Sequence, residues 1–242
     1  MLVLAIDAAT RFSGVALLEE RRVLAEYLVD SSLTHSTRLL PAIDMVFRDC
    51  ERSIRDLQGV IVTIGPGSFT GLRIGLSHAK GIAHSLGIPI VGVSTLLLWA
   101  CSIAPFTPIG SLLLPLLDAR RGEYYSALYE QNGDNALPLC EEAARSAEEI
   151  GNLMQSAFKS DKGLTITGDI PPSTHDALRQ VLGANVSIAA PRYSRPSPVT
   201  LANLGLERLL LGQSDDLYTL TPVYLRVSEA QRKREEQLQT PL

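Results

Sequence analysis

A stretch of 37 residues, 81–117, contains no Asp, Glu, Lys or Arg, and it constrains the fold more than any other feature of the sequence. A membrane span needs about 20 such residues in one helix. However, proline breaks a helix interior, and the stretch is interrupted at Pro89, Pro105, Pro108 and Pro115. It therefore divides into strands, a short helix and a loop. Strands this free of charge are covered on both faces, so we expect an α/β chain without a membrane segment.

The expected elements begin with three strands and continue with alternating helices and strands. The expected strands are Leu2–Ile6, Val15–Leu18, Val23–Val29, Gly59–Ile64 and Ile88–Val93, and the expected helices are Thr34–Asp49, Thr70–Leu86 and Ser94–Ile103. A doubly wound nucleotide-binding domain alternates from the start, whereas a three-strand meander followed by such alternation is typical of a ribonuclease-H-like lobe.

A second, weaker copy of this opening follows. The runs Leu112–Leu117 and Tyr124–Tyr129 flank Asp118 as the first two strands flank Asp7. After them we expect the helix Ala147–Phe158, the strand Leu164–Thr167, the helix Asp176–Leu182, the strand Val186–Ala189 and the helix Val199–Leu211. These elements predict a first lobe over 1–104, a reduced second lobe over 105–197, a helix near 198–212 that returns to the first lobe, and a charged tail over 228–242.

Composition limits the classes of function. The chain of 242 residues has 22 basic and 26 acidic side chains, and the net charge of −4 excludes binding of nucleic acid by bulk charge. Its three cysteines lie far apart without a histidine at ligand spacing, so they suggest neither a disulfide framework nor a zinc site. The first apolar run has no basic segment before it, which argues against secretion. We expect a cytoplasmic protein.

Two aspartates that follow predicted strands are candidates for phosphate or metal binding. Asp7 opens a polar turn with Thr10 and Ser13, and the hydroxyls and amides of such a turn can meet a phosphate. Asp118 opens a second turn beside Arg120. Both turns have a purely structural interpretation, because Asp, Thr and Ser are ordinary turn formers and Asp118 can pair with an arginine.

The most specific motif is Gly-Pro-Gly-Ser-Phe-Thr-Gly-Leu-Arg-Ile-Gly at residues 65–75. Ser68 or Thr70 can cap the helix that follows, and the glycines Gly65 and Gly67 would let the first amides of that helix face an anion. A tight turn before a well-capped helix explains the same residues. The motif is not a P-loop, because no lysine stands at the required spacing.

Small residues recur every four positions inside this helix, at Gly71, Gly75, Ala79 and Ala83. Glycine destabilises a helix interior by up to about 1 kcal/mol relative to alanine, so some contact must compensate. Residues four apart share one face, where small side chains let another backbone approach. That backbone belongs either to the chain's own sheet or to a second chain. We expect a partner interface along this row, together with the helix Thr34–Asp49.

These motifs resemble those of the TsaB family, also called YeaZ. The resemblance rests on the loop at 65–75, on Asp-Ala-Arg-Arg-Gly-Glu-x-Tyr at 118–125 and on Pro-x-Tyr-Leu-Arg at 222–226, and it covers the chain to about Arg226. It implies the fold of the actin, sugar-kinase and Hsp70 ATPases, with a degenerate second lobe. It also implies a role in forming threonylcarbamoyladenosine beside the anticodon of tRNAs, as a non-catalytic partner of the subunit TsaD and the small ATPase TsaE, and a homodimer when the chain is alone.

The resemblance also bears on catalysis. TsaD-like subunits hold a metal ion through two histidines four residues apart, and Thr95 and Trp99 take those places here. We therefore expect no metal and no catalytic residue. Ala9 and Arg120 follow the two aspartates where related ATPases favour glycine, so we expect no cofactor on the isolated chain, and ATP or ADP only at the level of a complex. The alternative is a small-molecule kinase of the same superfamily, for which Gly168-Asp169 would be the remnant of an adenosine pocket.

Overall fold

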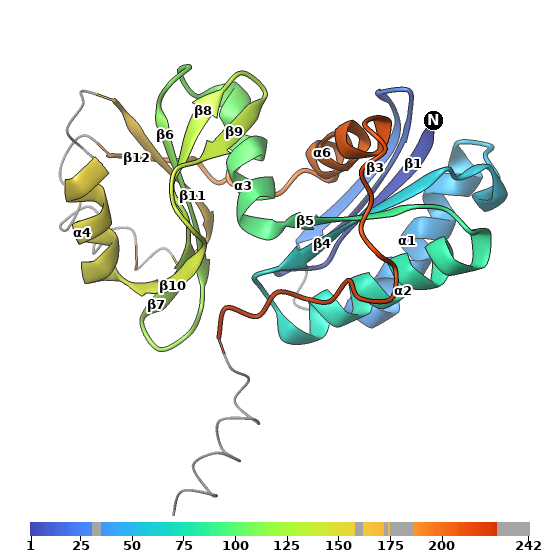
Figure 1. The fold of residues 1–242 in the computed structure, drawn as a ribbon, viewed down its shortest axis with the longest axis horizontal. Helices are drawn as coiled ribbons and strands as arrows, with labels where there is room; N and C mark the ends of the chain where they lie inside the picture. Colours follow the sequence, from blue (N-terminus) through green and yellow to red (C-terminus); the bar gives the residue numbers. More distant parts are fainter. Residues whose placement is uncertain (31–34, 158–161, 172–173, 175–185, 227–242) are drawn as a thin grey trace, which may run out of the picture.

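The computed structural model describes residues 1–30, 35–157, 162–171, 174 and 186–226. The chain forms two lobes that lie side by side, each built on a β-sheet (Figure 1). Within these described ranges, every helix falls short of the length and apolar character needed to cross a membrane. The predicted helix Asp176–Leu182 and the charged tail 228–242 lie outside the described residues.

The first lobe contains a five-stranded sheet with the strand order β3-β2-β1-β4-β5. Its strands are β1 (Leu2–Asp7), β2 (Phe12–Glu19), β3 (Arg22–Asp30), β4 (Gly59–Gly65) and β5 (Ile90–Ser94). Strands β1, β2 and β3 form an antiparallel meander, whereas β4 pairs parallel to β1 and β5 parallel to β4. The three-strand meander predicted from the sequence is confirmed.

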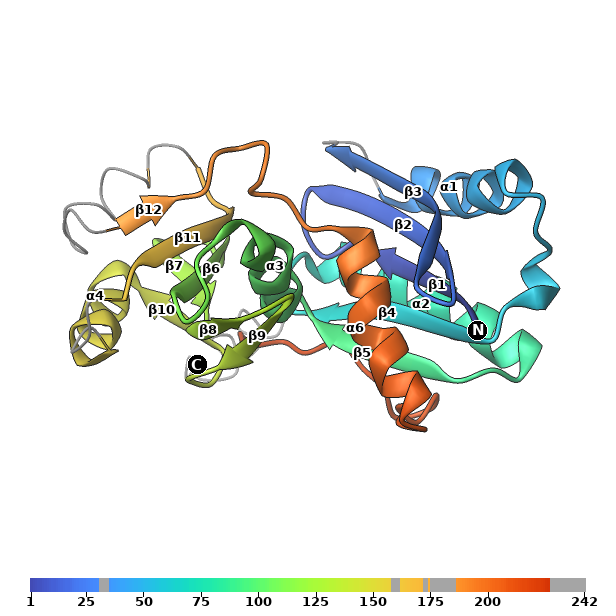
Figure 2. The ribbon, with the colours of Figure 1, turned by 90° about the horizontal axis from the view of Figure 1, so that it is seen from above.

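Helices cover both faces of this sheet, which explains why β4 and β5 carry no charged side chain. Helices α1 (His35–Asp49) and α2 (Phe69–Leu86) lie on one face, and α6 (Pro198–Leu210) lies on the other (Figures 1 and 2). A short 3₁₀ turn, η1 (Ile54–Asp56), precedes β4.

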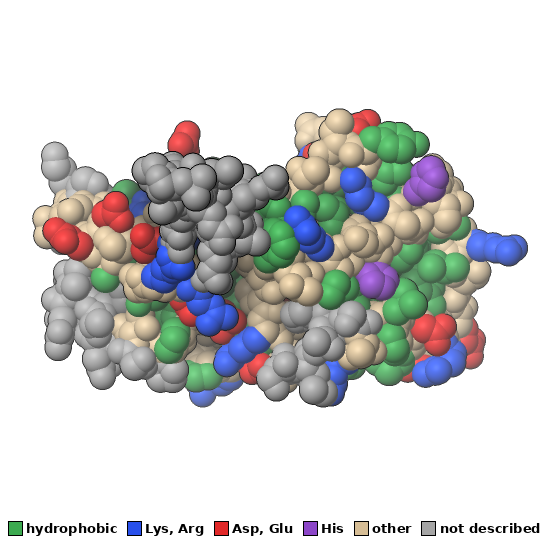
Figure 3. Space-filling view, turned by 90° about the horizontal axis from the view of Figure 1, so that it is seen from below, with side chains coloured by type: hydrophobic (Ala, Val, Ile, Leu, Met, Phe, Trp, Pro, Cys, Tyr) green, Lys and Arg blue, Asp and Glu red, His purple; other side chains and the backbone are tan. Residues whose placement is uncertain are grey.

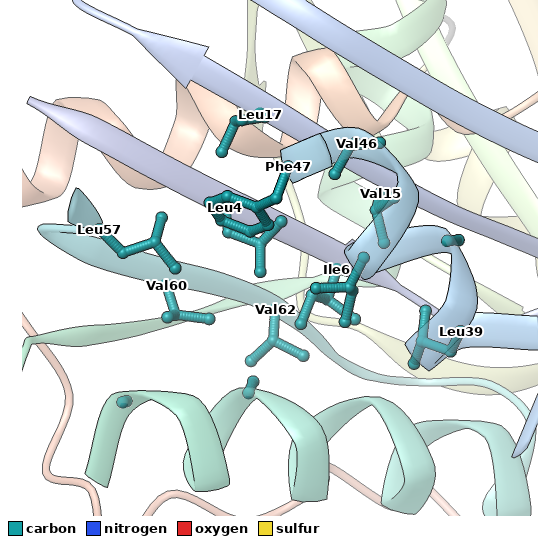
Figure 4. Packing of buried hydrophobic residues seen from close by; sticks show 14 of the residues in the cluster. Leu4, Ile6, Val15, Leu17, Leu39, Val46, Phe47, Leu57, Val60 and Val62 are labelled. Carbon is teal, nitrogen blue, oxygen red and sulfur yellow. The ribbon is translucent and has the colours of Figure 1, made fainter. Parts of the chain in front are cut away.

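Alternate residues of β1 belong to two different cores. Leu4 and Ile6 pack with α1 and α2, whereas Val3 and Ala5 pack with α6. Figure 4 shows the first of these cores, in which Val62 of β4 points toward α2. Because every side chain of β1 is buried, the turn at its end is held firmly between the two layers of helices.

The second lobe contains a sheet with the main order β10-β7-β6-β11-β12, in which β8 pairs with both β6 and β9. Its strands are β6 (Leu112–Asp118), β7 (Glu123–Ser126), β8 (Tyr129–Asn132), β9 (Asn135–Pro138), β10 (Ala143–Ser146), β11 (Leu164–Asp169) and β12 (Val186–Ile188). Helix α4 (Ala147–Ala157) follows β10. The α/β fold of two ribonuclease-H-like lobes, the second one reduced, is confirmed.

Helix α3 (Thr95–Ile103) and the 3₁₀ turn η2 (Ala104–Phe106) connect the two sheets. Ser94 caps α3, since its hydroxyl accepts a hydrogen bond from the Leu97 amide at 3.2 Å. The helix packs against both β6 and α6, so its apolar side chains lie between the lobes.

The sequence-based elements differ from the structure mainly in the second lobe. The predicted strand Tyr124–Tyr129 is two strands, β7 and β8, and the strands β9 and β10 are not predicted at all. Each of these strands has only four residues, which is too short for an alternating pattern to stand out. Elsewhere in the described part, predicted and observed elements agree to within a few residues at their ends.

Candidate functional site

The turn after β1 is buried except at Arg11. Asp7 is fully buried, and its Oδ1 accepts hydrogen bonds from the Thr63 hydroxyl at 2.8 Å and the Ala9 amide at 3.1 Å. Its Oδ2 has no partner among the described residues. Burial raises the pKa of Asp7 to about 6, although the hydrogen bonds oppose this shift. Thr10 and Ser13 are also buried, so all three side chains predicted to meet a phosphate face the interior of the protein.

The loop before α2 packs directly on this turn. A β-carbon on Gly67 would lie 2.2 Å from the carbonyl oxygen of Ala9, and the Ser68 amide donates to the same oxygen at 2.6 Å. On the other side of the loop, a β-carbon on Gly65 would lie 2.5 Å from the carbonyl oxygen of Val223. Gly65 also has a φ of +120°, which other residues rarely adopt. The two glycines are therefore needed because backbones approach the loop from two sides.

Ser68 fixes the first turn of α2 through two hydrogen bonds. The Ser68 hydroxyl accepts a hydrogen bond from the Gly71 amide at 3.2 Å, which confirms the predicted cap. The Leu72 amide donates to the Ser68 carbonyl oxygen at 2.9 Å, and Thr70 is exposed. The motif therefore forms a capped helix start that packs on a neighbouring turn.

The row of small residues on α2 faces the chain's own sheet. Gly71, Gly75, Ala79 and Ala83 are all buried, and a β-carbon on Gly75 would lie 3.4 Å from the β-carbon of Ala8. The prediction that this row forms a partner interface is therefore wrong. A row of small residues allows the backbone of either the same chain or a second chain to approach closely. Here the neighbouring backbone belongs to the chain's own sheet.

The opposite side of α2 is exposed, and we call it the α2 face. Its exposed residues are Phe69, Thr70, Arg73, Ser77, Gly81, His84 and Ser85. This side of the molecule is seen in Figure 3, where Lys and Arg side chains gather toward the junction of the two lobes. The α2 face is thus the part of this helix that a second protein can reach.

The segment Pro222–Arg226, which we call the strap, runs from the first lobe to the second. The Tyr224 ring packs on Phe69 with centroids 5.0 Å apart, and its hydroxyl accepts a hydrogen bond from Arg73 Nε at 3.0 Å. The Arg73 guanidinium also lies 3.8 Å above the centre of the Phe69 ring. These contacts hold the strap against the start of α2.

Arg226 ends the strap and holds the turn after β6. Its Nη1 donates to the carbonyl oxygens of Ala119 and Arg120 at 2.6 and 3.1 Å, and it lies 3.1 Å from Glu123 Oε2. Asp118 is exposed, and its Oδ1 accepts from the Arg120 amide at 2.7 Å. The turn is thus stabilised by Asp118 from within and by Arg226 from the other lobe. The sequence analysis includes Arg226 in a motif, but it does not predict that this side chain contacts the turn after β6.

A second contact between the lobes is made by Arg11, which the sequence analysis missed. Arg11 Nε lies 3.4 Å from Asp30 Oδ1 at the end of β3 and 3.2 Å from Asp169 Oδ1 at the end of β11. Burial raises the pKa of Asp169 although Arg11 opposes the shift. Gly168 lies so close to Leu116 of β6 that it leaves no room for a side chain. The pair Gly168-Asp169, predicted as a remnant of an adenosine pocket, therefore packs on β6 and binds Arg11.

The two residues that the resemblance aligns with a metal-ligand pair, Thr95 and Trp99, lie in the protein interior. Thr95 and Trp99 are fully buried, and the Trp99 ring meets Phe12 edge-on with centroids 5.9 Å apart. The His78 ring contacts its own helix, where its Nδ1 lies 2.7 Å from the Ile74 carbonyl oxygen. In the part of the chain that the structure describes, no three His, Cys, Asp or Glu side chains are placed to hold a metal ion.

Comparison with known families and curated proteins gives consistent matches. The family model described as "TsaD: tRNA N6-adenosine threonylcarbamoyltransferase" matches residues 29–190. The tRNA threonylcarbamoyladenosine biosynthesis protein TsaB of Bacillus subtilis is 35% identical over 235 residues, which is 96% of this chain and 97% of that protein. The protein of the same name from Escherichia coli is 36% identical over 132 residues, which is 54% of this chain and 56% of that protein.

A solved structure shares the fold. YeaZ from Pseudomonas aeruginosa has a TM-score of 0.79 and 23% sequence identity, over 93% of this chain and 99% of that chain. The similarity to the Bacillus subtilis protein spans nearly the whole of both chains. The three motifs noted in the sequence also meet in space, because the strap contacts both the loop before α2 and the turn after β6. The chain therefore belongs to the TsaB (YeaZ) family.

Proposed function

We propose that this chain is a non-catalytic subunit that acts with a TsaD-like subunit and a TsaE-like ATPase in forming threonylcarbamoyladenosine on tRNAs. The TsaD-like subunit transfers the threonylcarbamoyl group to the adenosine beside the anticodon. The names of the curated relatives and the TsaD family model support a role in threonylcarbamoyladenosine biosynthesis.

The observation that carries the non-catalytic role is the burial of Thr95 and Trp99 in the places of the metal-ligand pair. The surroundings support the same conclusion. Asp7 is closed to solvent, and Arg11 in the same turn is paired with Asp30 and Asp169. A nucleotide phosphate at this turn would have to displace these contacts. The chain is therefore suited to provide a binding surface rather than a catalytic group. We assign any nucleotide that the complex binds to the contact between this chain and its partner subunit.

We assign the partner surface to the α2 face together with the strap. Phe69 and Tyr224 are each 41% exposed, and Arg73 lies between them. Aromatic residues and arginine are enriched where proteins bind one another. On helix α1, which contacts α2, Leu40 is 54% exposed and is a further apolar residue that a partner can reach. The surface is rigid because the buried side of α2 is fixed on the sheet. We assign the homodimer of the isolated chain to the same surface.

The test is a binding measurement with the TsaD-like subunit from the same organism. Ser77→Leu places a larger side chain at the exposed centre of the α2 face, so we expect affinity to fall by about tenfold or more, equivalent to about 1.4 kcal/mol. Asn152→Leu on α4 is the matched control, since it makes a similar change on an exposed helix position of the second lobe. Unchanged affinity for Ser77→Leu would contradict the assignment of the surface.

The kinase alternative predicts a different result for the isolated chain. A small-molecule kinase would turn over many ATP molecules per chain without any partner, and Asp7→Asn would abolish that turnover. Our proposal predicts little or no ATP hydrolysis by the isolated chain.

A further inference from the structure

An open surface cavity of about 550 Å³ lies where the start of α3 meets the β8–β9 hairpin of the second lobe. Its lining includes Ser94, Leu97, Tyr129, Ala136, Leu139 and Glu142. Helix α3 and strand β9 pack against each other, and both views of the ribbon show them side by side (Figures 1 and 2). The cavity is largely open to solvent, so a small molecule can enter it directly. The residues of the strap and of the α2 face do not line this cavity.

Glu142 provides the main polar group of the cavity. The hydroxyls of Ser94 and Tyr129 both donate to its Oε1, the latter at 3.1 Å. Ser94 also accepts from the Leu97 amide, so its position is fixed by the cap of α3. These three polar side chains come from separate segments of the chain, and the two hydroxyls orient the carboxyl group. Among the described residues, Glu142 Oε2 has no hydrogen-bond partner, so it remains available to a molecule in the cavity.

The charge of the lining selects the kind of molecule. Two carboxylates, Glu141 and Glu142, line the cavity, and its lining in the described structure contains no Lys, Arg or His. A partly buried carboxylate without a cationic partner is costly, and burial raises the pKa of Glu142 accordingly. An anion would be repelled, and a neutral apolar molecule would leave Oε2 without a donor.

The remaining walls are apolar. Leu97, Ala136 and Leu139 line the cavity, and Leu139 is 49% exposed at its rim. The Cys140 sulfur already accepts a hydrogen bond from the Leu128 amide at 3.2 Å, so it does not offer itself as a metal ligand. A carboxylate among aliphatic walls fits a molecule with one charged end and a short hydrocarbon chain.

We propose that this cavity binds a small organic cation with an aliphatic chain, an alkylammonium or alkylguanidinium ion, whose charged group donates to Glu142 Oε2. The hydrocarbon chain lies along Leu97, Ala136 and Leu139. The bound molecule would contact α3, which connects the lobes, as well as the second sheet. This site is separate from the partner surface and does not rest on the proposed function.

The test is an NMR titration of the full chain with n-butylammonium chloride, with 1-pentanol as a neutral molecule of similar size. For so small a ligand we expect a Kd on the order of 1 mM, with shifted amide signals at Leu97 and Leu139. Glu142→Gln keeps an acceptor for both hydroxyls but removes the charge, and we expect it to weaken binding by about tenfold or more. Glu141→Gln is the matched control, because it removes the neighbouring exposed charge, and we expect a change of about threefold or less.

Equal binding of 1-pentanol and n-butylammonium, or unchanged binding to Glu142→Gln, would overturn the proposal. If Glu142→Gln does not fold, Leu139→Ser at the rim provides a second test, since it removes an apolar wall and should weaken binding of n-butylammonium several-fold. Titration with the blocked peptide Ac-Gly-Lys-Gly-NH₂ separates a free molecule from a lysine of another protein. Tighter binding of the peptide than of n-butylammonium would contradict the assignment to a free molecule.

Discussion

Arg226 donates a hydrogen bond to the carbonyl oxygen of Ala119 at 2.6 Å, which connects the end of the strap to the turn after β6 in the other lobe. Two sequence motifs that are far apart in the chain are thus two sides of one contact. The same guanidinium group forms an ion pair with Glu123 at 3.1 Å, and its side chain is only 25% exposed. Together with Arg11, it fixes how the two lobes sit against each other.

Replacing this arginine should destabilise the chain. Arg226→Ala leaves the carbonyl oxygens of Ala119 and Arg120 without their donor, and we expect the free energy of unfolding to fall by about 1–3 kcal/mol. Urea denaturation measures this change. Arg48→Ala is the control, because Arg48 is 68% exposed and pairs with the adjacent Asp49 on the same helix, and we expect a change within about 0.5 kcal/mol. Equal effects of the two substitutions would show that Arg226 contributes no more than a surface charge.

Because the small residues of α2 are buried, we expect substitutions there to change the stability of the chain rather than its binding to a partner. Gly75→Leu forces a large side chain against Ala8, Ile6 and Val62, which lie 3.4–3.9 Å from the position of a β-carbon. Overpacking of this kind costs about 1–3 kcal/mol. We expect thermal unfolding to occur at lower temperature, while the folded fraction still binds the TsaD-like subunit normally. Loss of binding without loss of stability would restore the row as an interface.

A glycine on the exposed side of the same helix should behave in the opposite way. A β-carbon on Gly81 meets nothing within 4 Å, and the residue lies in the helix interior with ordinary φ. Gly81→Ala should therefore stabilise the chain by about 0.5–1 kcal/mol, because alanine loses less backbone entropy in a helix. Chemical denaturation decides this, and a destabilised variant would mean that α2 is not regular at this point.

Asp7 should make stability depend on pH. Its pKa is raised from 3.8 to about 6, so between these values the folded protein binds more protons than the unfolded chain. The free energy of unfolding therefore decreases as pH rises from about 4 to about 6, by about 3 kcal/mol at most. Asp7→Asn should remove this component, which is measured as the difference between the variant and the unmodified protein across that range.

The control for this pH experiment is Asp44→Asn, which changes an exposed carboxylate on α1. Other buried carboxyl groups contribute equally to all three proteins and cancel in the differences. A pH profile of Asp7→Asn that runs parallel to that of the unmodified protein would show that Asp7 is not buried as described.

The first lobe could be predicted well because its signals are local. Ser68 caps α2, Gly87 ends it with a φ of 65°, and the apolar runs of β1 and β4 are continuous. The second lobe was harder, since β9 is a four-residue strand that ends in Pro138. Neither propensity nor periodicity distinguishes such a segment from a loop.

The candidate site was predicted only in part, for a physical reason. The residues of the motifs were found, but contacts such as Arg11 with Asp169 depend on how two lobes come together, which no local pattern encodes. The sequence also did not decide whether the small residues of α2 face the chain's own sheet or a second chain, because Gly71 and Gly75 allow a backbone from either one to approach closely. Only the packing of α2 on β1 and β4 decides between the two.

The central claim, that this chain is a required but non-catalytic subunit, is tested most directly by reconstitution. The TsaD-like and TsaE-like proteins of the same organism are incubated with threonylcarbamoyl donor, ATP and unmodified tRNA, with and without this chain, and threonylcarbamoyladenosine is quantified by mass spectrometry of the digested tRNA. We expect the modified nucleoside only when all three proteins are present, and none with this chain alone. Full modification without this chain, or modification by this chain alone, would contradict the account.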